Sequence, residues 1–184
     1  MMVPADYLLP KHTGTWTLED VLALPEDNSQ RVELVDGSLI VSPLGTSHHQ
    51  SLIGDAYAAL RSACPPGYQA TVELNVGLPD GGLLIPDFTV TKRPGFKGLL
   101  FPVGELALVG EVVSPSTRFK DYGVKRQRYA EAGVPFYLVI DPKGAEVAAT
   151  LFELVAGEYV EVARSEAGVL KLLHPYPVTI ELSP

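Results

Sequence analysis

The chain has 184 residues, a length that suits one domain with a substantial core, and we expect residues 1–184 to form a single domain. Its 14 basic and 22 acidic side chains give a net charge of −8 at pH 7 with histidine neutral, which excludes a protein that coats nucleic acid by charge alone but allows a local basic patch. The single cysteine, Cys64, cannot form an internal disulfide, and no stretch approaches the roughly 18 apolar residues of a membrane span, so we expect a cytoplasmic protein without a membrane partner.

The first predicted elements are a short helix, a β-hairpin and a longer helix. Thr17 is a typical N-cap with acids in the following turn, and this helix should end before Pro25. In RVELVDGSLIVSP, Asp36 and Gly37 lie between two alternating apolar runs, which indicates a tight hairpin turn. The next helix is predicted over residues 48–63 because apolar side chains recur there at helical spacing.

Three strands are predicted next, over residues 69–78, 83–91 and 106–114. The third reads as a strand buried on both faces, and Glu111 interrupts its apolar run. An ionised carboxylate in such a strand must be paired or bound to a metal. A second acid, Asp87, follows a proline in the preceding strand. Each of two strands therefore carries one acid, and the two carboxylates can meet at one point.

A cation-rich helix from about residue 119 to 132 precedes a β-rich run, PFYLVIDP. A helix between two strands indicates a βαβ crossover with parallel strands. Residues 147–154 and 158–163 should form a hairpin, and residues 169–182 one or two further strands. The predicted fold class is α/β, with a mixed β-sheet flanked by helices and additional β-hairpins.

The two strand acids and one lysine suit the chemistry of phosphodiester hydrolysis. That reaction needs a divalent cation at neutral pH, and Mg²⁺ is commonly held by one or two carboxylates with water and substrate phosphate, so Asp87 and Glu111 suffice. Lys125 could orient the attacking water or support the transition state. It shares a helix face with Tyr122 and Tyr129, which favours an inward position.

Several segments resemble the PD-(D/E)XK nuclease superfamily, and more closely its Uma-two family of restriction endonucleases. This resemblance implies a restriction-endonuclease-like fold, DNA as the substrate, and Mg²⁺, with Mn²⁺ as a substitute, as the cofactor. It also implies that Asp87 and Glu111 bind the metal, that Glu33 adds a further acidic contact, and that Lys125 completes the catalytic set. The segments that carry it are ELVDG (33–37), HQ (49–50), PDFTV (86–90), EVVSPST (111–117) and DYGVKRQRYAEAGVP (121–135).

Two departures from the family pattern support an alternative. The superfamily commonly places a lysine two residues after the second acid, where this chain has Val113, and Phe136 replaces an acid of the family. The alternative is a catalytically inactive nuclease-fold module that binds nucleic acid or a protein partner. A homodimer would suit double-strand cutting because it has two symmetric sites. The sequence leaves the oligomeric state open.

The individual site residues also have plainer interpretations. Glu111 could pair with Lys125 without any metal, and Lys125 could instead pair with Asp121 on a solvated helix face. His49 precedes a helix, where capping or exposure is commoner than catalysis. A basic cluster could contact DNA phosphates or could simply face solvent. Its members are Arg118, Lys120, Arg126 and Arg128.

Overall fold

The computed structural model describes residues 10–25, 30–43, 45–114, 120–142 and 146–182, and of residues 120–122 the backbone alone. The helical elements are α1 (Leu18–Leu22), α2 (Ser47–Ser62), the 3₁₀ helix η1 (Val103–Glu105), the π-helix η2 (Lys120–Lys125) and α3 (Arg126–Glu131). The strands are β1 (Gln30–Val35), β2 (Ser38–Pro43), β3 (Gln69–Val72), β4 (Val76–Gly77), β5 (Leu83–Leu84), β6 (Phe88–Thr91), β7 (Phe101–Pro102), β8 (Leu106–Val112), β9 (Phe136–Asp141), β10 (Ala148–Val155), β11 (Glu158–Arg164), β12 (Val169–Leu172) and β13 (Val178–Glu181).

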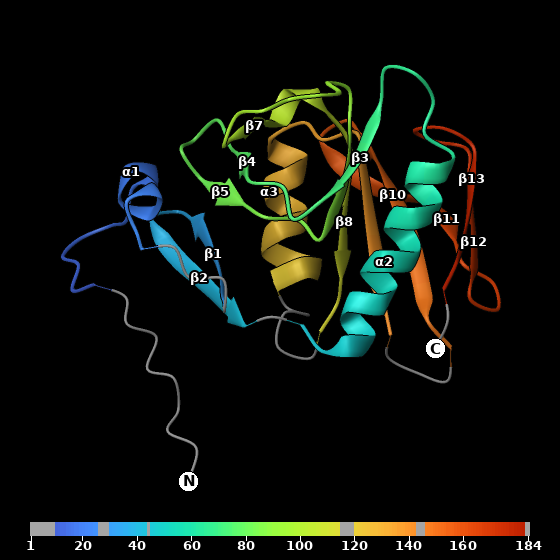
Figure 1. The fold of residues 1–184 in the computed structure, drawn as a ribbon, viewed down its shortest axis with the longest axis horizontal. Helices are drawn as coiled ribbons and strands as arrows, with labels where there is room; N and C mark the ends of the chain where they lie inside the picture. The colour runs from blue at the N-terminus through green and yellow to red at the C-terminus, as the bar shows by residue number, and fades with distance from the viewer. Residues whose placement is uncertain (1–9, 26–29, 44, 115–119, 143–145, 183–184) are drawn as a thin grey trace, which may run out of the picture.

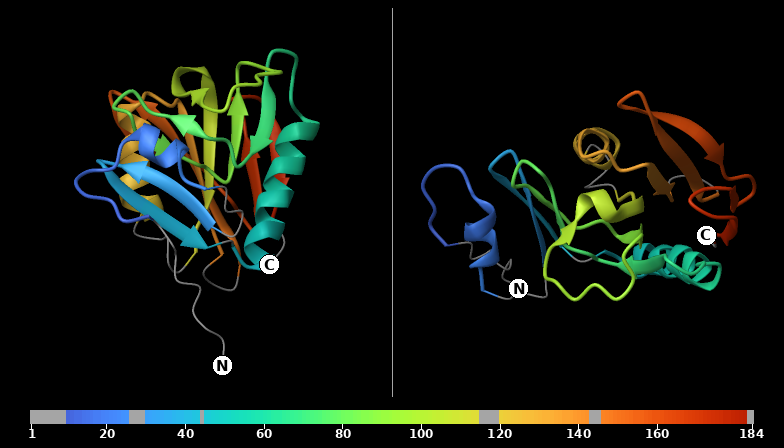
Figure 2. Two further views of the ribbon diagram at one scale, coloured as in Figure 1. Left: turned by 60° about the vertical axis from the view of Figure 1, so that its left-hand side comes forward. Right: turned by 90° about the horizontal axis from the view of Figure 1, so that it is seen from above.

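The strands of the described residues form three sheets (Figure 1). The central sheet has six strands in the order β11-β10-β9-β8-β6-β3, and a five-stranded sheet has the order β2-β1-β5-β4-β7. Strands β12 and β13 form the third. Helix α2 packs with β12 and β13 on one face of the central sheet, and α3 lies on the other (Figure 2). The fold is therefore the predicted mixed α/β class.

Local sequence signals account for the N-terminal elements. Thr17 and Asp20 form a reciprocal capping box, in which the Thr17 hydroxyl accepts from the Asp20 amide and the Asp20 carboxylate accepts from the Thr17 amide. The hairpin β1–β2 turns at Asp36 and Gly37, whose φ angles are 50° and 71°. Positive φ at both positions is the geometry that favours an Asp-Gly turn. The predicted helix and hairpin are both confirmed.

Two predicted strands are instead each divided between the two large sheets. The segment predicted over 69–78 forms β3 and β4, separated near Glu73, which has a φ of 49°. The segment predicted over 83–91 forms β5 and β6, with Pro86 and Asp87 between them. Because β3 pairs with β6 while β4 pairs with β5, both segments leave one sheet and enter the other. Asp87 therefore lies at the point where the chain changes sheets.

The predicted βαβ crossover is confirmed. Strand β8 pairs in parallel with β9, and every residue of β8 is buried. The connection contains η2 and α3, so the described part of the predicted helix begins with π-helical rather than α-helical turns. Helix α3 ends at Glu131, one residue before the predicted end, and the φ of 76° at Gly133 suits the chain just after a helix C-terminus. Among the described residues, no helix has both the length and the apolar character needed to cross a membrane.

The close approach of β6 and β8 gives a prediction about stability. A Cβ atom at Gly110 would lie 2.0 Å from the nearest ring carbon of Phe88, a fully buried side chain. We expect Gly110→Ala to lower the free energy of unfolding by about 1–3 kcal/mol, because the ring has little room to move. Urea denaturation measures this change.

Gly54→Ala is the matched control. Gly54 is an exposed position in α2, and a Cβ atom there would meet nothing within 4 Å. Since alanine is the better helix former, this variant should be as stable as the wild type or more stable by about 0.5–1 kcal/mol. Equal stabilities for the two variants would contradict the close packing at Gly110.

Candidate active site

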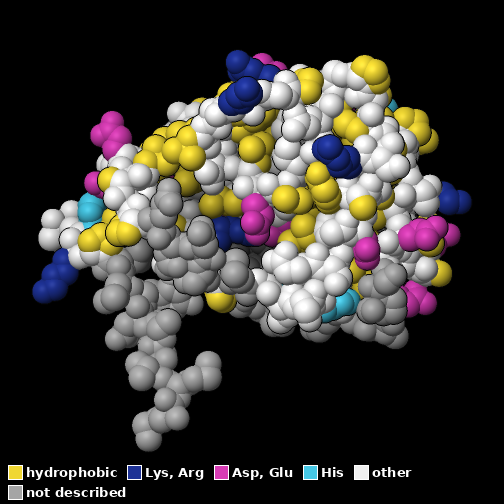
Figure 3. All heavy atoms as spheres, in the orientation of Figure 1, with side chains coloured by type: hydrophobic (Ala, Val, Ile, Leu, Met, Phe, Trp, Pro, Cys, Tyr) yellow, Lys and Arg dark blue, Asp and Glu magenta, His cyan; other side chains and the backbone are white. Residues whose placement is uncertain are grey.

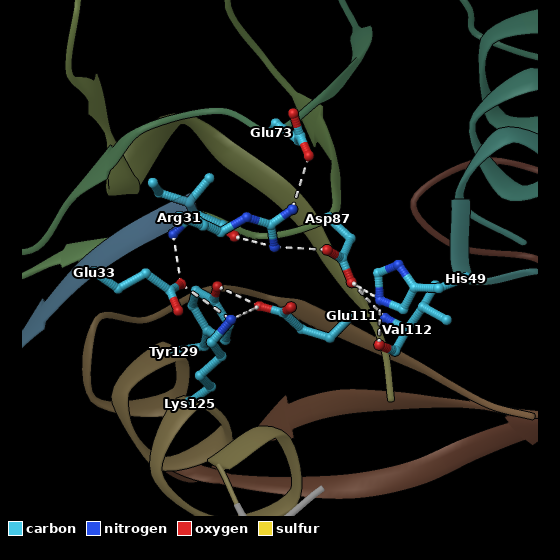
Figure 4. Close-up of polar contacts among 10 residues, drawn as sticks. Arg31, Glu33, His49, Glu73, Asp87, Glu111, Val112, Lys125 and Tyr129 are labelled. Atoms are coloured by element: carbon cyan, nitrogen blue, oxygen red, sulfur yellow. Dashed lines mark hydrogen bonds and ion pairs between the residues drawn. The ribbon is translucent and has the colours of Figure 1, made fainter. Parts of the chain in front are cut away.

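Four of the predicted site residues meet in the interior, on the face of the central sheet covered by α3 (Figure 4). Glu33 belongs to β1, Asp87 to the β5–β6 connection, Glu111 to β8 and Lys125 to the end of η2. Their exposed fractions are 1%, 2%, 2% and 3%. Residues from four separate elements are thus brought to one buried location, where unpaired charges would be costly.

Lys125 joins two of the acids. Its Nζ lies 3.0 Å from Glu33 Oε1 and 3.0 Å from Glu111 Oε1. Glu33 Oε1 also accepts a hydrogen bond of 2.8 Å from the backbone amide of Ile85. Because Glu33 comes from the five-stranded sheet and Glu111 from the central sheet, the lysine connects the two sheets. This position agrees with the prediction that the Lys125 side chain points into the protein.

Tyr129 completes the surroundings of Glu111. Its hydroxyl donates to Glu111 Oε1 over 2.9 Å from the buried face of α3. Burial raises the pKa of Tyr129 well above its ordinary value, and the negative charges of Glu111 and Glu33 raise it further. The phenol therefore stays protonated and acts as a donor. The sequence placed Tyr129 on the face of Lys125, and the structure adds its contact with Glu111.

Asp87 is held by different groups. Its Oδ2 accepts from the amide of Val112 over 2.7 Å, and its Oδ1 accepts from Arg31 Nη1 over 2.7 Å. Burial by itself lowers the pKa of Arg31, but the charge of Asp87 and the hydrogen bond to it raise that pKa above the ordinary value. The guanidinium is therefore charged throughout the pH range in which proteins fold. Arg31 was not predicted as a site residue from the sequence, because its partner lies 56 positions away.

His49 also faces the site, contrary to the expectation of capping or exposure. The cap of α2 is Thr46, whose hydroxyl accepts from the His49 amide. The imidazole Nε2 lies 2.9 Å from Val112 O and 3.6 Å from Asp87 Oδ2, whereas its Nδ1 is buried and has no hydrogen-bond partner within the described part of the chain. The HQ segment of the family resemblance was the only sequence signal for this position.

The acids suit a hard divalent cation by their chemistry and by their charge. Three buried carboxylates face two cationic side chains, Lys125 and Arg31, so this set has one acid more than it has bases. No three or more His, Cys, Asp or Glu side chains in the described ranges are arranged to hold a metal. The Mg²⁺ site expected from the sequence, in which Asp87 and Glu111 act with water and substrate oxygens, stays a prediction.

The predicted DNA-binding cluster has protein partners where the structure describes it. Arg126 donates to Tyr159 O over 2.6 Å, and its guanidinium carbon lies 4.6 Å from the ring centre of Phe152. Arg128 forms ion pairs with Asp36, Asp80 and Glu131. Arg118 lies outside the described residues, and Lys120 and Asp121 are described by their backbone alone. DNA binding by the cluster stays a prediction.

The two residues that depart from the family pattern, Val113 and Phe136, both pack against other side chains. Val113 is 2% exposed and packs in the apolar cluster that contains Tyr129 and Tyr137, a place that would not easily accept a lysine. Phe136 is half-buried, and its ring stacks on His174 with centroids 5.5 Å apart. Among the described residues, Lys125 is the lysine in contact with Glu111.

Comparison with known proteins supports the same fold. Residues 18–183 match the family Uma2, described as "Putative restriction endonuclease". The chain is also similar to a solved structure described as a putative nuclease belonging to DUF820 from Anabaena variabilis ATCC 29413. That likeness has a TM-score of 0.66 and 19% identity and covers 79% of this chain and 83% of the other, so it shows the fold alone. No curated protein sequence matches the chain.

Removal of the buried lysine charge should strongly destabilise the folded protein. Lys125→Met would leave Glu33 and Glu111 buried without the cation that lies between them, and we expect a loss of about 3–5 kcal/mol in the free energy of unfolding. Lys171→Met removes the same charge from an exposed position of β12 and should change stability by less than about 0.5 kcal/mol. Urea titrations of both variants measure the difference, and similar values would show that the Lys125 contacts contribute little.

Proposed function

The chain belongs to the Uma2 family of putative restriction endonucleases, and from this membership we propose that it is a Mg²⁺-dependent endonuclease that hydrolyses DNA phosphodiester bonds. One observation supports this proposal most strongly. Asp87 from the β5–β6 connection, Glu111 from β8 and Lys125 from the end of η2 come together in a buried location. Stability alone rarely favours such an arrangement, because buried ion pairs gain little over apolar packing.

In this proposal, Asp87 and Glu111 hold the metal, and Mn²⁺ can replace Mg²⁺. The bound ion would supply charge neutralisation at the phosphate and a nucleophilic water at neutral pH. Glu33 was predicted as a further acidic contact to the metal. Its Oε1 lies 3.0 Å from Lys125 Nζ and accepts from the amide of Ile85, so these contacts support a role in positioning the lysine.

The protein groups contribute position and charge. Lys125 Nζ is fixed by two carboxylates, so the ammonium can face the attacking water or the charge that develops on the phosphate without reorganising. Tyr129 restrains Glu111 through its hydrogen bond. In the reaction, the water gives up a proton to solvent as its oxygen bonds to phosphorus in line with the P–O3′ bond, that bond breaks, and the leaving 3′ oxygen takes up a proton from solvent.

Cleavage of supercoiled plasmid tests the proposal. With Mg²⁺ or Mn²⁺ the wild type should nick the plasmid, and EDTA should stop the reaction. Asp87→Asn and Glu111→Gln keep the side-chain shapes and should each slow cleavage by about 100-fold or more, because each removes a charged metal ligand. Glu158→Gln makes the same charge change at an exposed position of β11 and should leave the rate unchanged. Full activity of Asp87→Asn would contradict the assignment.

A specific observation also supports the alternative of an inactive nuclease-fold module. Arg31 already pairs with Asp87, and Lys125 already pairs with Glu111, so both acids have cationic partners without a metal. Calorimetric titration with Mn²⁺ separates the two functions. The endonuclease should bind Mn²⁺, and Glu111→Gln should weaken that binding by about tenfold or more. A folded wild type that takes up no Mn²⁺ would favour the binding module.

A further inference from the structure

Arg31 occupies the solvent side of the candidate site. Its side chain is 17% exposed and lies between Asp87, which is 3% exposed, and Glu73, which is 47% exposed (Figure 4). Exposure to solvent therefore increases from Asp87 through Arg31 to Glu73. Figure 3 shows acidic and basic side chains adjoining in a recess near the middle of one face of the molecule.

The two acidic partners of Arg31 differ in how firmly they are held. Nη1 of Arg31 donates to Asp87 Oδ1 over 2.7 Å and to Ile85 O over 3.3 Å, on the buried side. Nη2 donates over 2.9 Å to Oε1 of Glu73, whose side chain is half in solvent. An exposed ion pair contributes little, whereas a buried one is costly to break. Glu73 is thus the partner that another anion can replace.

A phosphodiester is a suitable replacement. The guanidinium forms two parallel hydrogen bonds equally well with a carboxylate and with the paired oxygens of a phosphate. Arg31 is also already ordered by Asp87 and Ile85, so the ligand would not have to immobilise a long side chain. The phosphate would then lie beside the carboxylate of Asp87, next to the proposed metal site.

We infer that Arg31 binds a backbone phosphate of the nucleic-acid substrate, and that Glu73 holds this guanidinium in the free protein until the phosphate displaces it. This inference rests on the proposed function, because it takes DNA as the ligand. Glu73 is then a competitor within the protein, and its removal should strengthen binding. A purely structural ion pair between Arg31 and Glu73 would give no such gain.

The test is the affinity for a fluorescently labelled DNA duplex, measured by anisotropy at low ionic strength in EDTA so that no cleavage occurs. Glu73→Gln should bind up to about fivefold more tightly than the wild type, because the phosphate no longer has to break the exposed ion pair between Glu73 and Arg31. Glu158→Gln is the charge-matched control, since it is exposed in β11, at the opposite edge of the central sheet from β3. It should leave the affinity unchanged.

Repeating the measurement in the Arg31→Gln variant tests whether the gain in affinity depends on Arg31. In that background, Glu73→Gln should bring no gain, because the guanidinium for which the acid and the phosphate compete is absent. Thermal melts show whether the Arg31 variants are folded. If they are not, the comparison of Glu73→Gln with Glu158→Gln decides alone, since Glu73 is exposed.

Three outcomes would each overturn the inference. The wild type and Glu73→Gln could bind DNA with equal affinity, Glu73→Gln and Glu158→Gln could gain affinity equally, or no variant could bind the duplex. These outcomes differ from failure of the proposed function. A wild type that cleaves plasmid while Glu73→Gln binds no better would refute the role of Arg31 alone. A wild type that never cleaves, but shows the predicted pattern of affinities, would refute the nuclease and retain the phosphate site.

Discussion

The arrangement of the site depends on the contacts of Lys125 with Glu33 and Glu111, each 3.0 Å long. All three side chains are almost fully buried, and a buried charge persists only where an opposite charge and hydrogen bonds compensate its lost hydration. The acids come from different sheets, and the lysine comes from the crossover between β8 and β9. Compensation of these charges therefore also fixes how the two sheets and the crossover meet.

A second ion pair makes the same connection on the solvent side. Arg31 extends from β1 to Asp87, at the point where the chain passes from the five-stranded to the central sheet. The Val112 amide holds the other oxygen of Asp87. Among the described residues, every acid of the site thus has a protein partner, and three acids face two cations, Lys125 and Arg31. In the proposed function, a divalent cation would add positive charge beside these acids, whose contacts hold them in place.

Part of this site could be predicted from the sequence. Glu111 is conspicuous because it interrupts an apolar strand, and Lys125 because it shares a helical face with tyrosines, so their meeting follows from local patterns and a βαβ crossover. Arg31 could not be found in this way, because its partner is 56 positions distant and no local pattern encodes such a contact. The division of two predicted strands between the two large sheets could not be predicted for a related reason. Apolar runs show that a segment is extended, but pairing partners decide which sheet it joins, and the turn at Glu73 uses a residue without the usual signal of glycine.

The proposed function requires that Asp87 and Glu111 together hold a divalent cation. Its most direct test is a crystal structure of the protein soaked in Mn²⁺, with anomalous diffraction measured at the manganese absorption edge. If both residues are metal ligands, an anomalous peak should lie in contact with carboxylate oxygens of both Asp87 and Glu111. A well-ordered structure with no peak there, in which Arg31 and Lys125 keep their present ion pairs, would show that Asp87 and Glu111 do not hold the cation.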